Sequence, residues 1–298
     1  MSYLITGGGG FIGSNIAEML AKRGEKVRIL DNFSTGKREN LATLQSVSKR
    51  NPEHNVEIIE EDIRDLETCQ RATRGVHYVL HHATMVSAVS QSVLEPLLCN
   101  AINVMGTLNM LIAARDEGVK RFVLASSSAV YGDGEEEITP DSTIPSVACR
   151  AAMPVAPMTP CTVSKWVGEN YCRIFHDLYG LETVCLRYFN VFGPRQDHAS
   201  EYAAVIPKFI DAHRQGRQPI VYGNGRQSRD FVFVEDVVRA NQQACVAPEE
   251  VAGKVFNVAN HRAIILLELL DALKAILNVD TAPRFSEARK GDIRHSWA

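Results

Sequence analysis

Short apolar runs alternate with segments of helical spacing along most of the chain. Runs typical of strands lie at residues 3–6, 27–30, 56–59, 76–81, 121–125 and 183–187. Between them apolar residues recur at helical intervals, as Ile16, Ala17, Met19 and Leu20 do after the first run. Strands that alternate with helices predict an α/β fold, with a doubly wound parallel sheet and helices on both of its faces.

The alternation breaks into shorter pieces after Phe192. Turn signals follow at Gly193-Pro194, Gly216 and Gly223-Asn224-Gly225. We therefore expect residues 1–175 to form a first domain. Residues 176–298 are expected to form mainly a smaller C-terminal α/β lobe that is partly interleaved with the first domain.

Composition narrows the classes of function. The 298 residues suffice for about two domains of roughly 150 residues each, and 45% hydrophobic with 22% charged residues is ordinary for a globular protein. A net charge of −3 without a basic run predicts a small-molecule partner rather than nucleic acid or a membrane surface. We see no apolar stretch long enough for a membrane span and no signal peptide. Seven cysteines without metal-ligand spacing indicate reduced thiols and a cytoplasmic location.

A glycine-rich turn formed by Gly7, Gly10 and Gly13 lies between the first predicted strand and helix. Pyrophosphate can rest on the backbone amides at the start of a helix only where no Cβ obstructs its approach. Asp31 ends the second predicted strand, where a carboxylate can accept hydrogen bonds from both hydroxyls of an adenosine ribose. Because that carboxylate repels a 2′-phosphate and no arginine directly follows it, we predict NAD rather than NADP, bound to a Rossmann-type domain.

Asp62 and Ile63 follow the third predicted strand. In a Rossmann-type domain this position suits a contact with the adenine of the dinucleotide. An aspartate here also suits the N-cap of the next helix, so this alternative stays open.

Three successive hydroxyls, those of Ser126, Ser127 and Ser128, follow the fifth predicted strand. Side chains at the carboxyl end of such a strand can bond a ligand in the crevice of the sheet. A serine-rich turn without a ligand is the alternative.

Motifs typical of one known family lie along nearly the whole chain, at residues 6–13, 31–36, 126–132, 186–193, 228–231 and 291–296. With these motifs the chain resembles the nucleotide-sugar 4-epimerases of the extended short-chain dehydrogenase/reductase family.

The resemblance implies that bound NAD takes a hydride from C4 of a UDP-sugar and returns it to the other face of a transient 4-keto sugar. Ser127 would hydrogen-bond the 4-oxygen, and Lys165 would hold the nicotinamide ribose and lower the pKa of a tyrosine four residues before it. The expected contacts with NAD are Gly7, Gly10, Phe11, Ile12, Gly13, Asp31, Asn32, Phe33, Ser34, Thr35, Gly36, Asp62, Ile63, His82, Ala83, Thr84, Asn103, Lys165 and Phe189.

The family's tyrosine is absent, because Cys161 stands four residues before Lys165. A thiol, with a pKa of about 8.5, ionises more easily than a phenol at about 10, so acidity is no obstacle. The short reach of the cysteine side chain is an obstacle, since proton transfer needs heavy atoms within about 2.6–3.2 Å or a bridging water. Three alternatives follow: epimerisation relayed by water or assisted by Ser127; a weakly active variant or another redox outcome; and a thiol that only packs in an NAD-binding protein without turnover.

The segment between Tyr131 and Cys161 is longer than the family's usual spacing, so part of residues 146–153 is expected to be an insertion. The histidines His81 and His82 and the glutamates at 135–137 could suggest a metal site. We predict none, because the histidines end a strand beside the cofactor and such a glutamate run is typical of a solvated loop.

The resemblance also implies contacts with the UDP-sugar. They are Ser87, Ser127, Asn190, Ala204, Val205, Ile220, Tyr222, Arg229, Arg289, Asp292 and Ser296. Arg229 and Arg289 offer fork-shaped donors to a diphosphate, with surface ion pairs as the alternative. Epimerases restricted to UDP-glucose and UDP-galactose carry a bulky tyrosine at the position of Ser296. A small residue there favours a 2-acetamido group, as in UDP-N-acetylglucosamine and UDP-N-acetylgalactosamine.

Related 4,6-dehydratases and decarboxylases share the fold and cofactor but place an acid just after the residue that aligns with Ser127. Here Ser128 and Ala129 follow, which favours an epimerase. An NAD-binding sensor is the alternative outside the enzyme class. Helices expected around residues 103–117 and 162–179 carry apolar residues on more than one face. The resemblance implies that these helices join two copies of the chain in a four-helix bundle.

Overall fold

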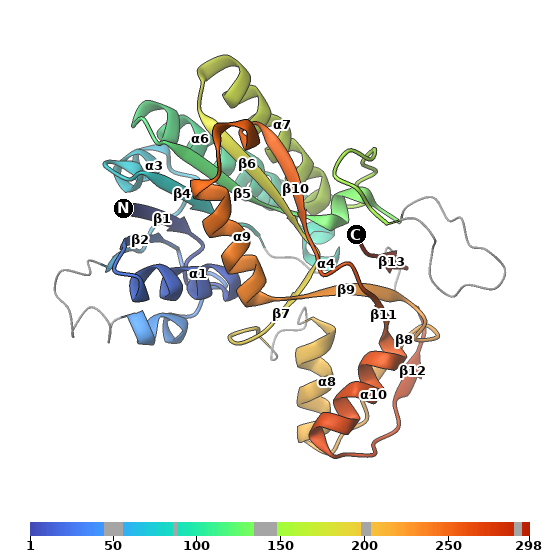
Figure 1. Cartoon of the computed structure of the whole chain (residues 1–298). Coiled ribbons are helices and arrows are strands. Elements are labelled where there is room, and N and C mark those ends of the chain that lie inside the picture. The colour runs from blue at the N-terminus through green and yellow to red at the C-terminus, as the bar shows by residue number, and fades with distance from the viewer. Residues whose placement is uncertain (45–55, 86–88, 134–147, 198–203, 289–293) are drawn as a thin grey trace.

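A seven-stranded sheet forms the centre of the computed structural model (Figure 1). The structure describes residues 1–44, 56–85, 89–133, 148–197, 204–288 and 294–298. The strands lie in the order β10-β6-β5-β4-β1-β2-β3, and every neighbouring pair is parallel. Their bounds are Ser2–Thr6 (β1), Lys26–Leu30 (β2), Val56–Ile59 (β3), Tyr78–His81 (β4), Arg121–Ser127 (β5), Glu182–Tyr188 (β6) and Lys254–Val258 (β10). The predicted doubly wound α/β fold is confirmed.

Helices cover both faces of this sheet (Figure 1). Successive residues of a strand point to opposite faces, so Leu4 and Ile5 of β1 belong to two different apolar cores. The core that contains Ile5 packs on α1 (Phe11–Lys22) and α9 (Val234–Val246). The core that contains Leu4 packs on α3 (Leu66–Thr73), α6 (Gly106–Asp116) and α7 (Pro160–Tyr179).

The strand order reverses between β1 and β4. From β1 the chain continues outward to β2 and β3, whereas β4, β5 and β6 extend the sheet in the other direction. The loops that leave two such neighbouring strands diverge to opposite faces, which opens a crevice at their carboxyl ends. The turn after β1 and the loop after β4 lie close together: a Cβ on Gly7 would be only 2.7 Å from the backbone nitrogen of Ala83.

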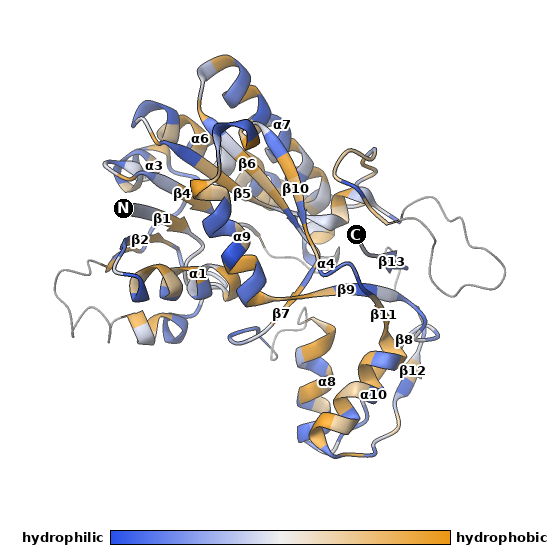
Figure 2. Ribbon diagram, in the orientation of Figure 1, coloured by the Kyte–Doolittle hydropathy of each residue, from blue (hydrophilic) through white to orange (hydrophobic). Residues whose placement is uncertain are grey.

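A smaller lobe follows β6 (Figure 1). Its elements are β7 (Asn190–Phe192), α8 (Val205–Arg214), β8 (Ile220–Tyr222), β9 (Ser228–Phe233), β11 (Ala263–Ile265), α10 (Leu266–Leu277), β12 (Arg284–Ser286) and β13 (His295–Ser296). Figure 2 shows apolar residues over much of α8 and α10, whose buried members include Phe209 and Leu270. The strands β6 and β10 and the helix α9 lie beyond residue 175 yet belong with the central sheet, so the chain crosses between the two parts.

One helical stretch, Pro96–Asp116, is long and apolar enough by composition to span a membrane, which the sequence pattern alone did not reveal. It comprises α5 (Pro96–Asn100), a π-helical turn (Ala101–Met105) and α6. It packs on α3 and α7 and buries the polar side chains of Asn103 and Thr107 through hydrogen bonds. These contacts are those of a core helix. The remaining short helical elements are Arg38–Leu41, Val89–Leu94, Ser128–Tyr131 and Glu249–Val251.

Candidate active site

The glycine turn presents bare backbone to the crevice. Gly7 has a φ of +67°, a conformation that side chains rarely adopt, and any Cβ on Gly13 would collide with the carbonyl oxygen of Gly7. Gly10 begins α1 without a capping side chain among the described residues, and the first turn of α1 contains no acidic residue. The amides at this helix start therefore suit an anion, and the residues present fit the pyrophosphate of a dinucleotide.

We expect the substitution Gly13→Ala to abolish detectable NAD binding. The added Cβ meets backbone atoms of Gly7 and Gly8, so relief requires the turn itself to move away from the pyrophosphate. Titration calorimetry with NAD measures the loss. Gly168→Ala is the control, because that Cβ meets only side chains of Leu124 and Thr107, and its NAD affinity should be unchanged. Equal affinity of Gly13→Ala and the parent would contradict the assignment of this turn.

Asp31 lies directly after β2 and faces the glycine turn. Its carboxylate accepts hydrogen bonds from the backbone amides of Gly9 and Phe33, both at 2.8 Å. Burial raises the pKa of Asp31 above its ordinary value, and the two amide bonds oppose that rise. Each carboxylate oxygen retains a second lone pair, so Asp31 can still accept from ribose hydroxyls.

Asp62 does not cap a helix. Asp65 does, since its side chain accepts from the amides of Glu67 and Thr68 at the start of α3. Asp62 instead bonds Arg64 and the side-chain amide of Asn32, and the bond from Arg64 lowers its pKa to about 2. The N-cap alternative is therefore wrong. Ile63 is buried in the core against Gly106, so its contact with adenine stays a prediction.

The loop after β4 is tied to α7 by Asn103. The Oδ1 atom of Asn103 accepts from the Thr84 hydroxyl at 2.9 Å and from the Met85 amide at 2.7 Å. Its Nδ2 atom donates to the Ser164 hydroxyl at 2.9 Å. In this loop the Nε2 atom of His82 is buried without a hydrogen-bond partner among the described residues, and burial lowers the pKa of this ring to about 3.

Lys165 contacts the carboxyl end of β5, the strand that ends at Ser127. The Lys165 ammonium donates to the carbonyl oxygen of Ala125 at 2.8 Å, two residues before Ser127. Burial lowers the pKa of Lys165. The Ser127 hydroxyl oxygen accepts from the amide of Ala129 and so begins the turn Ser128–Tyr131. The serines therefore do start a turn, and Ser127 lies at the carboxyl end of β5, the strand that Lys165 contacts.

Cys161 occupies the first turn of α7, after the N-cap Thr159 and Pro160. Its sulfur lies 4.0 Å from the Met85 carbonyl oxygen and 4.0 Å from Asn103 Nδ2. Lys165 follows one helical turn later and interacts electrostatically with this thiol. The thiol, the ammonium and the loop after β4 are thus brought together at the crevice.

The sequence did not predict a buried ion pair that lies next to the site. Arg187 donates two parallel hydrogen bonds to Glu169, at 2.8 and 2.7 Å, and Ser126 donates to the same carboxylate at 2.5 Å. Glu169 lies one turn after Lys165 on α7, and Arg187 lies on β6. This pair connects the serine motif to the helix that carries Cys161 and Lys165. Its only sequence signal was a charged residue within an otherwise apolar strand.

The described part of the expected insertion packs beside that ion pair. The carbonyl oxygen of Ala151 accepts from Arg187 at 3.2 Å, and that of Cys149 accepts from the Asn257 side chain at 2.9 Å. The amide of Cys149 donates to the Trp297 carbonyl oxygen. Residues 148–153 therefore join the C-terminal segment to the base of the site.

Three of the predicted UDP-sugar contacts share one sheet of the smaller lobe. Asn190 of β7 pairs with Phe231 of β9, and Ser296 of β13 pairs with Arg229 of β9. Ile220 and Tyr222 lie on β8, which pairs with β12, while Ala204 and Val205 begin α8. Phe189 is buried directly after β6, with its ring 6.5 Å from that of Tyr131. Ser87, Arg289, Asp292 and the glutamates at 135–137 lie outside the described residues.

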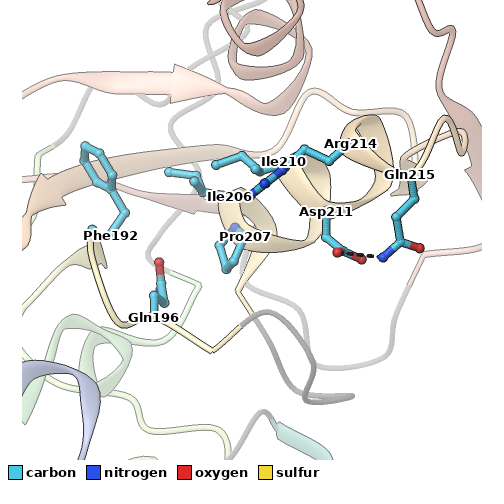
Figure 3. Close-up of a pocket in the computed structure, with 9 residues that line it drawn as sticks. Phe192, Gln196, Ile206, Pro207, Ile210, Asp211, Arg214 and Gln215 are labelled. Atoms are coloured by element: carbon cyan, nitrogen blue, oxygen red, sulfur yellow. Dashed lines mark hydrogen bonds between the residues drawn. The ribbon is translucent and has the colours of Figure 1, made fainter. Parts of the chain in front are cut away.

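A pocket of about 610 Å³ opens between the end of β7 and α8 (Figure 3). Figure 3 shows Phe192 and Gln196 facing the helix residues Ile206, Pro207 and Ile210 across it. It adjoins the strand that carries Asn190 and the helix that begins after Ala204. Among the described residues no group of three or more His, Cys, Asp or Glu side chains could hold a metal ion.

A family model described as "NAD dependent epimerase/dehydratase family" matches residues 3–259. The chain belongs to this family. Its cofactor is therefore NAD, in agreement with the glycine turn and Asp31. A solved UDP-glucose 4-epimerase of Thermus thermophilus in complex with NAD is 34% identical, with a TM-score of 0.84 over 99% of this chain and 89% of that chain.

Other relatives of this epimerase/dehydratase family member act on UDP-sugars. A solved UDP-N-acetylglucosamine 4-epimerase from Methanobrevibacter ruminantium, in complex with UDP-N-acetylmuramic acid, is 38% identical with a TM-score of 0.87 over 100% of this chain and 88% of that chain. A UDP-N-acetyl-alpha-D-glucosaminuronate decarboxylase of Bacillus cytotoxicus is 35% identical over 258 residues, 86% of this chain and 74% of that protein. The family thus includes more than one reaction.

Proposed function

We propose that this protein interconverts UDP-N-acetylglucosamine and UDP-N-acetylgalactosamine, or UDP-glucose and UDP-galactose, through a transient 4-keto sugar. The observation that carries the proposal is the Lys165 ammonium, which bonds the Ala125 carbonyl oxygen two residues before Ser127 and lies one helical turn after Cys161. The 38% identity to a UDP-N-acetylglucosamine 4-epimerase supports the N-acetylated pair as the first choice.

Each group in the site has its own role in the proposed reaction. Bound NAD supplies the hydride acceptor and donor. The Ser127 hydroxyl hydrogen-bonds the 4-oxygen of the sugar, and a water relays the proton between that oxygen and the Cys161 thiol, since the thiol is shorter than the family's phenol. The Lys165 ammonium stabilises negative charge on this relay and holds the cofactor's ribose. Asn190, Arg229 and the predicted Arg289 bind the diphosphate.

Incubation of the purified protein with UDP-N-acetylglucosamine tests the proposal. Proton NMR should show UDP-N-acetylgalactosamine accumulating to a constant ratio, without net consumption of NAD. If no UDP-hexose changes while NAD still binds, the epimerase proposal fails and an NAD-binding sensor replaces it.

A decarboxylase or dehydratase is the second candidate, because the Bacillus cytotoxicus relative is 35% identical. Those reactions need an acid next to the serine. At this point the chain has Ser128, which is buried, and Ala129, whose amide bonds Ser127. Release of carbon dioxide from a UDP-hexuronate, or a stable 4-keto-6-deoxy product, would favour this candidate over the epimerase.

Ser296 is the residue we propose to admit the 2-acetamido group. It is nearly buried on β13, in register with Arg229. We expect Ser296→Tyr to lower kcat/KM for UDP-N-acetylglucosamine at least about 10-fold, because a phenol fills the space of the acetamido group, a loss of about 1.4 kcal/mol. The kcat/KM for UDP-glucose serves as the control and should change little. An equal fall for both substrates would contradict a role in selectivity.

A homodimer through α6 and α7 is also proposed. Exposed apolar side chains lie on α7 at Val163, Trp166, Ile174 and Leu178. Since a stripe of this kind is costly in water, a second copy of the chain suits it. Trp166→Glu should convert a dimer into a monomer in sedimentation velocity, whereas Ile276→Glu, at an exposed apolar position on α10, should leave the dimer intact. A monomeric parent protein would refute the proposal.

A cytoplasmic location stays our expectation.

A further inference from the structure

Two thiols meet at the proposed catalytic position. Cys99 of α5 and Cys161 of α7 both lie beside the side-chain amide of Asn103, with sulfurs 3.4 Å and 4.0 Å from its Nδ2 atom. The helices α5 and α7 pack on each other. All seven cysteines of the chain are thiols in the structure.

The neighbouring Cys161 thiol also affects the protonation of Cys99. A hydrogen bond with Cys161 is the largest cause that raises the pKa of the Cys99 thiol, and burial raises it further. Cys99 is therefore a protonated thiol at neutral pH. Lys165 and the start of α7 provide the opposite environment for Cys161, since a nearby ammonium and helix-terminal amides stabilise a thiolate.

Solvent exposure also distinguishes Cys99 from Cys161. Cys99 is fully buried, whereas Cys161 is partly exposed at the crevice. An oxidant that enters the crevice can therefore reach Cys161 and not Cys99. Such an arrangement is typical of a reactive thiol with a resolving partner behind it.

We propose that Cys161 is a peroxide-sensitive modification site and that Cys99 resolves it by forming a Cys99–Cys161 disulfide, which switches off the catalytic position reversibly. The second adjacent pair in the chain, Cys172 and Cys185, is buried in the core and is not expected to react.

The steps balance with a peroxide as the oxidant. The Cys161 thiol first ionises and its proton passes to solvent. The thiolate attacks one peroxide oxygen, an S–O bond forms, the O–O bond breaks, and the departing oxygen takes up a proton from solvent as water or an alcohol. The sulfur is oxidised to a sulfenic acid while the peroxide is reduced. Cys99 then attacks this sulfur, so that the S–S bond forms, the S–O bond breaks, and hydroxide leaves with the Cys99 proton as water.

The disulfide would join α5 to the first turn of α7 and remove the thiol from the crevice. Asn103 lies between the two sulfurs and also holds Thr84 and Met85. We therefore expect the oxidised protein to lose epimerase activity and a dithiol reductant to restore it. Formation of the disulfide is measured by mass and does not depend on the proposed epimerase function.

The experiment treats the full-length protein with hydrogen peroxide and then maps its peptides without reduction. We expect a Cys99–Cys161 linked peptide, a titrated thiol number lower by two, and Cys172 and Cys185 still as thiols. Cys99→Ser retains a small acceptor for Asn103, and its activity before peroxide treatment serves as its own reference. After peroxide it should form no disulfide and should carry a sulfenic acid on Cys161 that dimedone labels.

Two outcomes would overturn the proposal. One is a peroxide-treated protein that contains no link between these two cysteines, or links other cysteines first. The other is a Cys99→Ser variant that loses activity to peroxide and recovers with a dithiol just as the parent does, without a labelled sulfenic acid. Intact disulfide chemistry in a protein that epimerises nothing would instead count against the proposed function alone.

Discussion

Replacing Arg187 with methionine should lower the free energy of unfolding by about 3–5 kcal/mol, because it leaves the buried Glu169 carboxylate without its cation. The side chains of Arg187 and Glu169 are 5% and 4% exposed, so water cannot replace the lost partner. Two of the hydrogen bonds on Glu169 disappear with the guanidinium, and among the described residues only the one from Ser126 remains. Urea unfolding followed by circular dichroism measures the change.

An exposed pair on the same helix provides the matched control. Arg173 and Asp177 are spaced i,i+4 on α7 with side chains 59% and 50% exposed. Arg173→Met should cost at most about 0.5 kcal/mol, since solvent already screens that pair. The double variant Arg187→Met with Glu169→Gln should recover much of the loss, because the amide needs no counterion and still accepts from Ser126. A cost below about 1 kcal/mol for Arg187→Met would contradict a buried, desolvated pair.

The sheet was predictable where both faces of a strand are buried. All residues of β4 are buried, and β5 and β6 are nearly so, hence their apolar runs stand out in the sequence. The edge strand β10 was not recognised. Lys254 and Phe256 are exposed, and Lys254 and Asn257 interrupt its apolar residues, so no continuous apolar run stands out. Neighbouring strands, not its own composition, place β10 in the central sheet.

The same distinction applies to the candidate site, where features set by local sequence were predicted and features set by long-range contacts were not. The glycine turn and Asp31 depend on local backbone, so their spacing in the sequence was enough. The ion pair of Glu169 with Arg187 arises only when β6 returns beside α7, and no local pattern reports that. Asp62 and Asp65 illustrate a third case, because two aspartates precede α3 and only the residue at which the helix starts decides which one caps it.

Cys161→Tyr should raise kcat for the UDP-sugar about 10²-fold. A positioned acid–base group contributes about 10²–10⁴-fold, and a phenol at this place reaches the 4-oxygen without the intervening water. Lys165, one turn later on α7, is already present to stabilise the phenolate. Single-turnover kinetics by rapid quench, at saturating NAD, separate this chemical step from product release.

Cys161→Phe separates the hydroxyl from the ring. It fills the same volume without an ionisable group, so it should show no gain over the parent. Substrate binding measured by calorimetry should be equal for the tyrosine and phenylalanine variants, because the difference between them lies in proton transfer alone. A gain in both variants would assign the effect to packing against Met85 and Asn103 instead.

The pH dependence distinguishes the two acid–base groups in the same assay. In the parent, the rate should follow a thiol whose ordinary pKa is about 8.5, and in Cys161→Tyr a phenol whose ordinary pKa is about 10, each lowered by the lysine ammonium. If the tyrosine instead slows turnover while the parent is fast, the thiol and residues 148–153 form a different catalytic arrangement. In that case the hydrogen bond from Arg187 to the Ala151 carbonyl oxygen would be the first contact to disrupt, because it joins residues 148–153 to the helix of Cys161 through Glu169.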